Sequence, residues 1–152
     1  MSHIWRVAGR LAFWLGWPGL WLYLYRSQRT RVLITHDDQL LLVQGWLSAG
    51  TWEMPGGGRH RHESALAAAQ REIREETGLS ITPEQFTEIG SFQARGHGFR
   101  YQYTLLRVAL VEQAQTVSQR GEIVAVQWFS RDELADIKLS PQLKTALVHW
   151  PR

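Results

Sequence analysis

The chain has 152 residues, no cysteine and a formal net charge of +3. This length suits one domain with a buried core, and the absence of cysteine excludes disulfides and thiolate ligands and favours a reducing compartment. Residues 1–31 hold five arginines and no acidic residue, so the rest of the chain is net acidic. We therefore predict a cytoplasmic protein without the basic surface that nucleic-acid binding requires.

Residues 1–30 form an apolar segment rich in aromatic residues and arginine. The fifteen residues between Arg10 and Arg26 carry no charge, but as a helix they would span about 22 Å, less than the roughly 30 Å hydrocarbon core of a bilayer. Pro18 would also kink such a helix. Aromatic residues beside arginines are typical of membrane interfaces. We expect a helical extension that packs on the domain, forms a homodimer or contacts the membrane surface.

The domain at residues 31–152 is expected to begin with a β-hairpin. Arg31–Thr35 and Gln39–Gln44 are β-rich runs separated by a short polar turn. Their nearly continuous apolar character is typical of strands that are covered on both faces. The loop that follows carries Trp46, which could stack on a nucleobase or pack as a partly buried aromatic residue.

A glycine turn and an acidic helix follow the hairpin. The turn contains Gly56, Gly57 and Gly58, and the helix that comes next is predicted to end at Gly78. Glu72, Glu75 and Glu76 lie close together on this helix, because residues three and four apart share a face. Such carboxylates repel one another, and a hard divalent cation such as Mg²⁺ or Mn²⁺ would turn this repulsion into binding.

The packing face of the same helix is predicted from its apolar residues. Leu66, Ala69 and Ile73 recur at spacings of three and four, which gives an apolar stripe for contact with the sheet. We expect the carboxylates to lie on the opposite face.

The segment Gly57–Leu79 resembles the complete Nudix box of the Nudix hydrolase family. A glycine is followed after five residues by Glu63, and after seven more by the run Arg71-Glu-Ile-Arg-Glu-Glu-Thr-Gly-Leu79. The resemblance implies an α/β/α sandwich with a mixed β-sheet between helices. It also implies metal-dependent hydrolysis of the pyrophosphate bond of a nucleoside diphosphate linked to another moiety, with Mg²⁺ or Mn²⁺ as the cofactor.

The resemblance also assigns roles to residues. It implies that Arg71 orients a carboxylate and that Glu75, Glu76 or Glu122 acts as the general base. Glu122 enters because many family members place a further glutamate in the loop before the last strand. The implied metal ligands are Gly57, Glu72, Glu75, Glu76 and Glu122.

The remaining elements complete one α/β unit. A short helical turn is predicted at Thr82–Gln85. Strands are predicted at Phe86–Arg95, Phe99–Val111 and Ile123–Phe129, and helices at Ser130–Ala135 and Ser140–His149.

Candidate substrate contacts lie outside the helix. Trp46, Arg59 in a basic run and His97 in a glycine turn are available to a small nucleotide, although each also fits a solvated loop residue. We predict a nucleoside triphosphate or a nucleotide-diphosphate derivative as the substrate. A non-catalytic nucleotide-sensing module tethered through residues 1–30 is the alternative.

Overall fold

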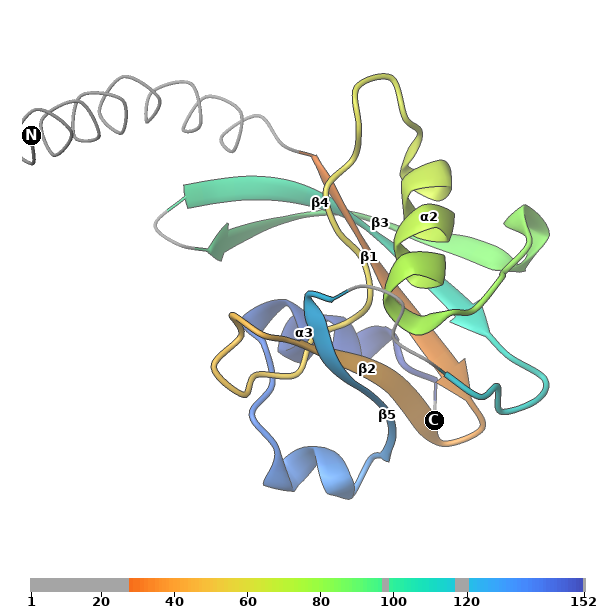
Figure 1. Cartoon of the computed structure of the whole chain (residues 1–152), viewed down its shortest axis with the longest axis vertical. Coiled ribbons are helices and arrows are strands. Elements are labelled where there is room, and N and C mark those ends of the chain that lie inside the picture. The colour runs from red at the N-terminus through yellow and green to blue at the C-terminus, as the bar shows by residue number, and fades with distance from the viewer. Residues whose placement is uncertain (1–27, 97–98, 117–120, 152) are drawn as a thin grey trace, which may run out of the picture.

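The computed structural model describes residues 28–96, 99–116 and 121–151, which fold into one sheet with helices on both sides (Figure 1). The strands are β1 (Arg29–His36), β2 (Gln39–Gly45), β3 (Phe86–Gly96), β4 (Phe99–Ala109) and β5 (Ile123–Ser130). The helices are α2 (Ala65–Thr77) and α3 (Pro141–Ala146), with 3₁₀ turns at η1 (Pro83–Gln85), η2 (Glu133–Asp136) and η3 (Leu147–His149).

The sheet is mixed, with the strand order β3-β4-β1-β2-β5. β1 and β2 form the predicted antiparallel hairpin, in which Ile34 pairs with Leu41. β1 runs parallel to β4, with Val32 opposite Leu106, because the chain crosses over through α2 and β3 before it returns as β4. β1 begins at Arg29 rather than at Arg31, so its first two residues extend beyond the predicted strand.

Two apolar cores lie on the two faces of the sheet, as the continuous apolar runs predict. Val32 and Ile34 point toward α2 and pack with Ile73, whereas Leu33 points to the other face and packs with Leu143 of α3. Successive side chains of a strand alternate between faces, so one strand supplies both cores. The expected α/β/α sandwich is confirmed.

Helix α2 ends at Gly78, as the sequence predicts, and Ser64 caps its start. The Ser64 hydroxyl accepts a hydrogen bond of 3.0 Å from the backbone N–H of Ala67 at the N-terminus. Gly78 adopts a left-handed conformation with φ of 76° and donates its N–H to the carbonyl of Arg74 at 3.0 Å. These are ordinary helix caps, and they fix where the helix starts relative to the glycine turn.

The predicted extension lies largely outside the described residues. Residues 1–27 are not described, so packing, dimerisation and membrane contact of this segment stay predictions. In the described ranges, no helix has both the length and the apolar character needed to cross a membrane.

Candidate active site

The glycine turn is fastened to the first half of β1. The N–H of Thr30 donates to the carbonyl of Gly57 at 2.9 Å, and the N–H of Val32 donates to the carbonyl of Pro55 at 2.9 Å. Gly58 and Arg29 also form an antiparallel bridge. The turn therefore runs beside β1 like a short additional strand.

The Arg31 side chain forms hydrogen bonds with the backbone of the glycine turn. Its side chain is buried, and Nη1 donates to the carbonyls of Met54 and Gly56. Nη2 forms an ion pair of 3.1 Å with Glu53 Oε2. A buried guanidinium requires such partners, so Arg31 fixes the backbone that leads into the site. The sequence did not indicate this role, because the contacts span 22 to 25 residues.

Two of the three glycines are required by close contacts. Gly56 has a φ of +132°, and a Cβ there would overlap the carbonyl oxygen of Thr30. A Cβ at Gly57 would lie 2.5 to 2.8 Å from the carboxylate atoms of Glu72. A Cβ at Gly58 would meet open space. The turn thus brings its backbone directly against a carboxylate of α2.

The α2 carboxylates are mostly buried between the helix and the glycine turn. Glu72 and Glu76 are only 3% and 8% exposed, and Glu76 Oε2 accepts a hydrogen bond of 2.8 Å from the N–H of Gly56. The expectation that the carboxylates face away from the packing stripe is therefore wrong for these two residues. Both are neighbours of Ile73 around the helix, and the turn, instead of solvent, covers them.

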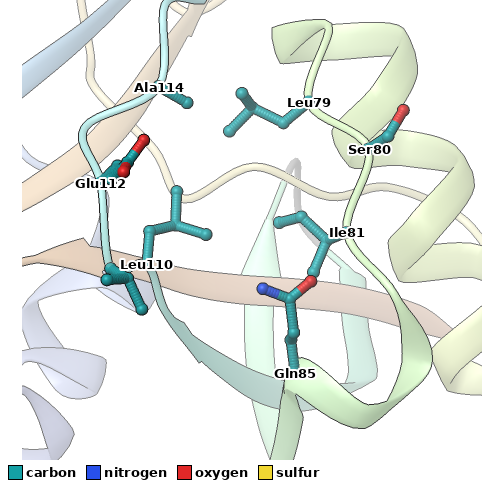
Figure 2. Close-up of a pocket in the computed structure, with 8 residues that line it drawn as sticks. Leu79, Ser80, Ile81, Gln85, Leu110, Glu112 and Ala114 are labelled. Atoms are coloured by element: carbon teal, nitrogen blue, oxygen red, sulfur yellow. The ribbon is translucent and has the colours of Figure 1, made fainter.

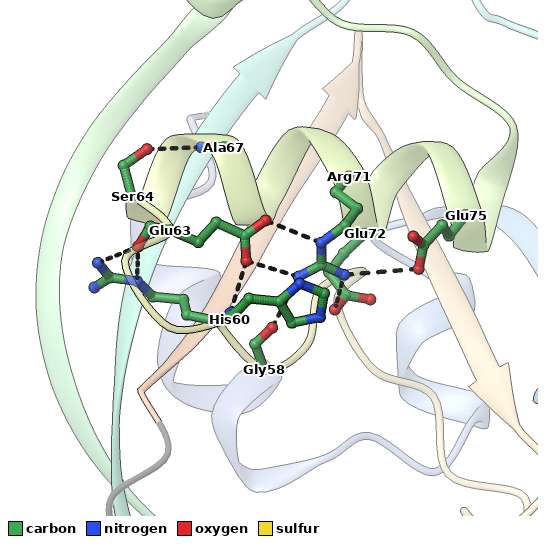
Figure 3. A network of polar contacts seen from close by, with 9 residues as sticks. Gly58, His60, Glu63, Ser64, Ala67, Arg71, Glu72 and Glu75 are labelled. Carbon is green, nitrogen blue, oxygen red and sulfur yellow. Dashed lines mark hydrogen bonds and ion pairs between the residues drawn. The ribbon is translucent and has the colours of Figure 1, made fainter.

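Arg71 connects the glutamates of the helix (Figure 3). Its Nε and Nη2 bind the two oxygens of Glu63 at 2.9 and 3.0 Å. Nη1 lies 2.7 Å from Glu72 Oε1 and 3.6 Å from Glu75 Oε2, and Nη2 also donates to the Gly58 carbonyl at 2.9 Å. The guanidinium thus contacts three carboxylates and the turn, and it holds them in one arrangement.

Glu63 anchors this arrangement, a role that the sequence alone does not indicate. The two hydrogen bonds from Arg71 lower the pKa of Glu63 to about 2, with a further contribution from the N–H of His60. The same pair of bonds raises the pKa of Arg71 above its usual value. Paired fork-to-fork contacts of this kind fix orientation as well as charge.

An open pocket of about 310 Å³ lies between the glycine turn, the residues that directly follow β2 and the start of β5. Trp46 is 64% exposed on its rim, and the N–H of Trp46 donates to the carbonyl of Glu122 at 3.0 Å. The pocket therefore brings together four of the predicted site residues: Trp46, Gly57, Glu76 and Glu122.

The other predicted contacts are placed differently. Arg59 does not line this pocket; its guanidinium donates to the carbonyl of Glu63 at 3.1 and 2.7 Å and to Gln28 Oε1 at 2.6 Å. Glu75 is also absent from the lining, since its carboxylate lies near Arg71. His97 lies outside the described residues.

The carboxylate and carbonyl oxygens at this site are suitable ligands for a hard divalent cation. Glu72 and Glu76 are buried against the glycine turn. The Gly57 carbonyl of this turn accepts one hydrogen bond and retains a second lone pair. Oxygen ligands of this type fit Mg²⁺ or Mn²⁺. Among the described residues, no three acidic or histidine side chains are already gathered as a metal cluster. Arg71, placed between Glu72 and Glu75, offsets their mutual repulsion.

A second pocket of about 310 Å³ shares no lining residue with the first. It lies between the segment after α2 and the segment after β4 (Figure 2). Leu79, Ile81 and Leu110 supply apolar walls, and Glu112 is the one carboxylate among the described lining residues. The first pocket, with Glu76 and Glu122, is therefore the candidate active site.

The fold and the site together define an α/β/α protein that sets buried helix carboxylates against a glycine turn at the edge of an open pocket. The NUDIX domain model matches residues 26–150. The chain belongs to the Nudix family.

Relatives are found in several bacteria. "Putative 8-oxo-dGTP diphosphatase 3" of Mycobacterium tuberculosis is 31% identical over 135 residues, which cover 86% of this chain and 60% of that protein. "NAD-capped RNA hydrolase NudC" of Stutzerimonas stutzeri is 30% identical over 93% of this chain and 50% of its own length. The chain thus spans less than two thirds of these curated relatives.

Solved structures confirm the fold. A NUDIX hydrolase from Nitrosomonas europaea is similar with a TM-score of 0.69 at 23% identity, covering 82% of this chain and 88% of that protein. The Nudix hydrolase RenU of M. smegmatis gives a TM-score of 0.60 at 26% identity, covering 84% and 88% of the two chains.

Proposed function

We propose that the protein hydrolyses the pyrophosphate bond of a nucleoside diphosphate linked to another moiety, in a reaction that requires Mg²⁺ or Mn²⁺. One observation carries the proposal: two glutamates from separate elements, Glu76 and Glu122, line the same pocket as an exposed Trp46 and the Gly57 turn. The printed names of the relatives, which include a diphosphatase and an RNA pyrophosphohydrolase, support this reaction class.

Glu72, Glu76 and the Gly57 carbonyl are the proposed metal ligands, with Glu75 and Glu122 as further candidates. When bound, Mg²⁺ or Mn²⁺ supplies positive charge that offsets the negative charge of the pyrophosphate in the transition state. The protein contributes the fixed position of the ligands. Arg71 holds Glu72 through a contact of 2.7 Å, a supporting role that metal sites commonly require.

The general base must reach water in the pocket. Glu76 and Glu122 line the pocket, whereas Glu75 does not. Glu76 already accepts a hydrogen bond from Gly56, which favours a fixed ligand over a group that exchanges protons. We therefore favour Glu122 as the residue that takes the proton from the attacking water.

Trp46 is the proposed contact for the nucleobase. Its indole is largely exposed at the rim of the pocket, and an aromatic plane can stack on any base. Arg59 and His97 are further candidates, although the guanidinium of Arg59 is engaged by Glu63 and Gln28.

A phosphate-release screen tests the proposal. The panel contains nucleoside triphosphates, an 8-oxo-purine triphosphate, ADP-ribose, nucleotide sugars and 5′-capped or triphosphorylated RNA, each with Mg²⁺ or Mn²⁺. The RNA members are included because relatives carry the names "NAD-capped RNA hydrolase NudC" and "RNA pyrophosphohydrolase". Metal-dependent turnover that Glu76→Gln abolishes would support the enzyme. Nucleotide binding without turnover of any substrate would instead support a sensing module.

Residues 1–30 are proposed to contact a membrane surface, the domain or a second subunit. Flotation with anionic vesicles separates the first case from the others. The full chain is expected to float, and a protein that lacks residues 1–26 is expected to remain in the soluble fraction. Equal behaviour of the two proteins would contradict membrane contact through this segment.

A further inference from the structure

Among the described residues, two arginines line the candidate active site, and their contacts differ. Arg31 is engaged by Glu53 and by two backbone carbonyls. Arg29, two residues earlier on the same face of β1, lines the pocket with Glu76 and Glu122 but forms no ion pair with a described residue. Arg31 thus has a carboxylate and two carbonyls as partners, whereas the charge of Arg29 is not balanced by a described carboxylate in an ion pair.

Arg29 is held in place by an aromatic ring. Its guanidinium lies 4.7 Å above the centre of the Tyr101 ring on β4. The Tyr101 hydroxyl accepts a hydrogen bond of 2.6 Å from Gln142 Nε2 on α3. Stacking on a ring fixes the plane of a guanidinium without using its N–H groups. The contacts therefore orient Arg29 while they leave donors available.

One of these donors is buried and lacks a partner. Arg29 Nε is inaccessible to solvent and has no acceptor among the described residues. Leaving such a donor unsatisfied is unfavourable, and most buried polar groups do find a partner. Arg29 also lines the open pocket, so its guanidinium lies where a ligand could supply an acceptor, although Nε itself is closed to solvent in this arrangement.

We propose that Arg29 is a substrate-binding residue that donates to a phosphate oxygen of the nucleotide, with Tyr101 and Gln142 as its positioning residues. A phosphate is the favoured acceptor because a guanidinium binds its oxygens with parallel donors. The pocket is also lined by the carboxylates of Glu53, Glu76 and Glu122, so a cation is needed there to admit a polyanion. This inference rests on the proposed function, since it takes the same pocket as the nucleotide site.

Binding measurements test Arg29 without relying on turnover. Calorimetry compares a nucleoside with its mono-, di- and α,β-methylene triphosphate on the full chain. The wild type should bind more tightly as phosphates are added. Arg29→Gln should weaken triphosphate binding by about 10- to 100-fold and should leave the nucleoside unchanged. Arg29→Lys should restore part of the loss, because it keeps the charge but not the fork of donors.

Tyr101 and the controls complete the experiment. Tyr101→Leu removes the ring and should weaken triphosphate binding less than Arg29→Gln does, and Tyr101→Phe should have a smaller effect. Arg95→Gln, a matched change of an exposed arginine on β3, should bind like the wild type. Thermal unfolding is followed for every variant, and Arg29→Lys supplies the test if Arg29→Gln does not fold.

The outcomes are distinguishable. Equal loss for the nucleoside and the triphosphate, or an unchanged triphosphate affinity in Arg29→Gln, would overturn the assignment of Arg29. Failure of the wild type to bind any phosphorylated ligand would overturn it as well. Phosphate-dependent binding without hydrolysis of any substrate would retain Arg29 and refute the enzymatic proposal.

Discussion

Gly57 and Glu72 are in direct contact, and a Cβ at position 57 would lie 2.5 Å from Glu72 Oε1. Gly57→Ala should therefore displace the carboxylate of Glu72 or the turn itself. We expect a loss of at least about tenfold in kcat, since small displacements of catalytic groups are costly. Steady-state kinetics with the best substrate of the phosphate-release screen measures the effect.

Gly58→Ala is the matched control for this change. A Cβ at Gly58 would meet no atom within 4 Å, so the variant should retain activity near that of the wild type. Similar losses in both variants would show that the turn requires glycine for flexibility and not for contact with Glu72.

Glu76→Gln tests the carboxylate that the turn holds. The amide oxygen can still accept the hydrogen bond from Gly56, so the free energy of unfolding should change little. Activity should fall by about 10²- to 10⁴-fold, because the charge needed at the site is removed. Glu84→Gln alters an exposed glutamate of η1 and serves as the control. Retained activity in Glu76→Gln would remove this residue from the catalytic machinery.

Glu122→Gln tests the proposed general base. Loss of the base should reduce kcat by about 10²- to 10⁴-fold while substrate binding persists. Near wild-type kcat would assign Glu122 to the pocket wall alone.

The lowered pKa of Glu63 predicts that the stability of the folded protein depends on pH. Its pKa of about 2 in the folded protein lies below the usual value of 4.5, so the unfolded chain binds the proton more tightly. The stabilising contribution is complete above about pH 4.5 and is lost as pH falls toward 2. After allowance for solvent screening, we expect it to be about 1 to 2 kcal/mol.

Urea unfolding between neutral pH and the lowest pH at which the protein folds measures this contribution. Glu63→Gln should be less stable at neutral pH and should lose less stability on acidification than the wild type. Glu112→Gln, a change at an exposed glutamate, is the control and should follow the wild type. Parallel curves for Glu63→Gln and the wild type would contradict the role of the Arg71 pair.

Trp46→Ala tests the nucleobase contact. Removal of a stacking surface worth about 1 to 3 kcal/mol per base should raise KM by about 5- to 100-fold. The value of kcat should remain similar, because the ring binds ground state and transition state alike. Val148→Ala changes an exposed apolar residue outside the pocket and should leave KM unaltered. Equal KM values for wild type and Trp46→Ala would place the base elsewhere.

Most of the fold can be predicted from local sequence signals. Ser64 and Gly78 set the ends of α2, and the apolar runs around Leu33 and Leu41 predict strands that are buried on both faces. These signals are local, because caps and strand periodicity depend on residues close together in the chain. The Nudix box likewise predicts a family that the domain match confirms.

The site was less predictable because its contacts join distant segments. Nothing near Arg31 in the sequence indicates that it binds the carbonyl of Gly56, 25 residues away. The helix periodicity placed Glu72 and Glu76 on the face opposite the apolar stripe, but both are buried and the glycine turn covers them. Only the tertiary arrangement shows which carboxylates share the pocket with Trp46.

The pairing of the glycine turn with β1 also determines where the chain can be cut. Gln28 accepts from the N–H of Arg59, Thr30 donates to Gly57, and Arg29 lines the pocket. Shortening the protein to begin at residue 31 would therefore remove three supports of the site together with the apolar segment. A protein shortened to begin at Ser27 keeps all three, so it is the version in which the proposed membrane contact can be tested while the supports of the site stay intact.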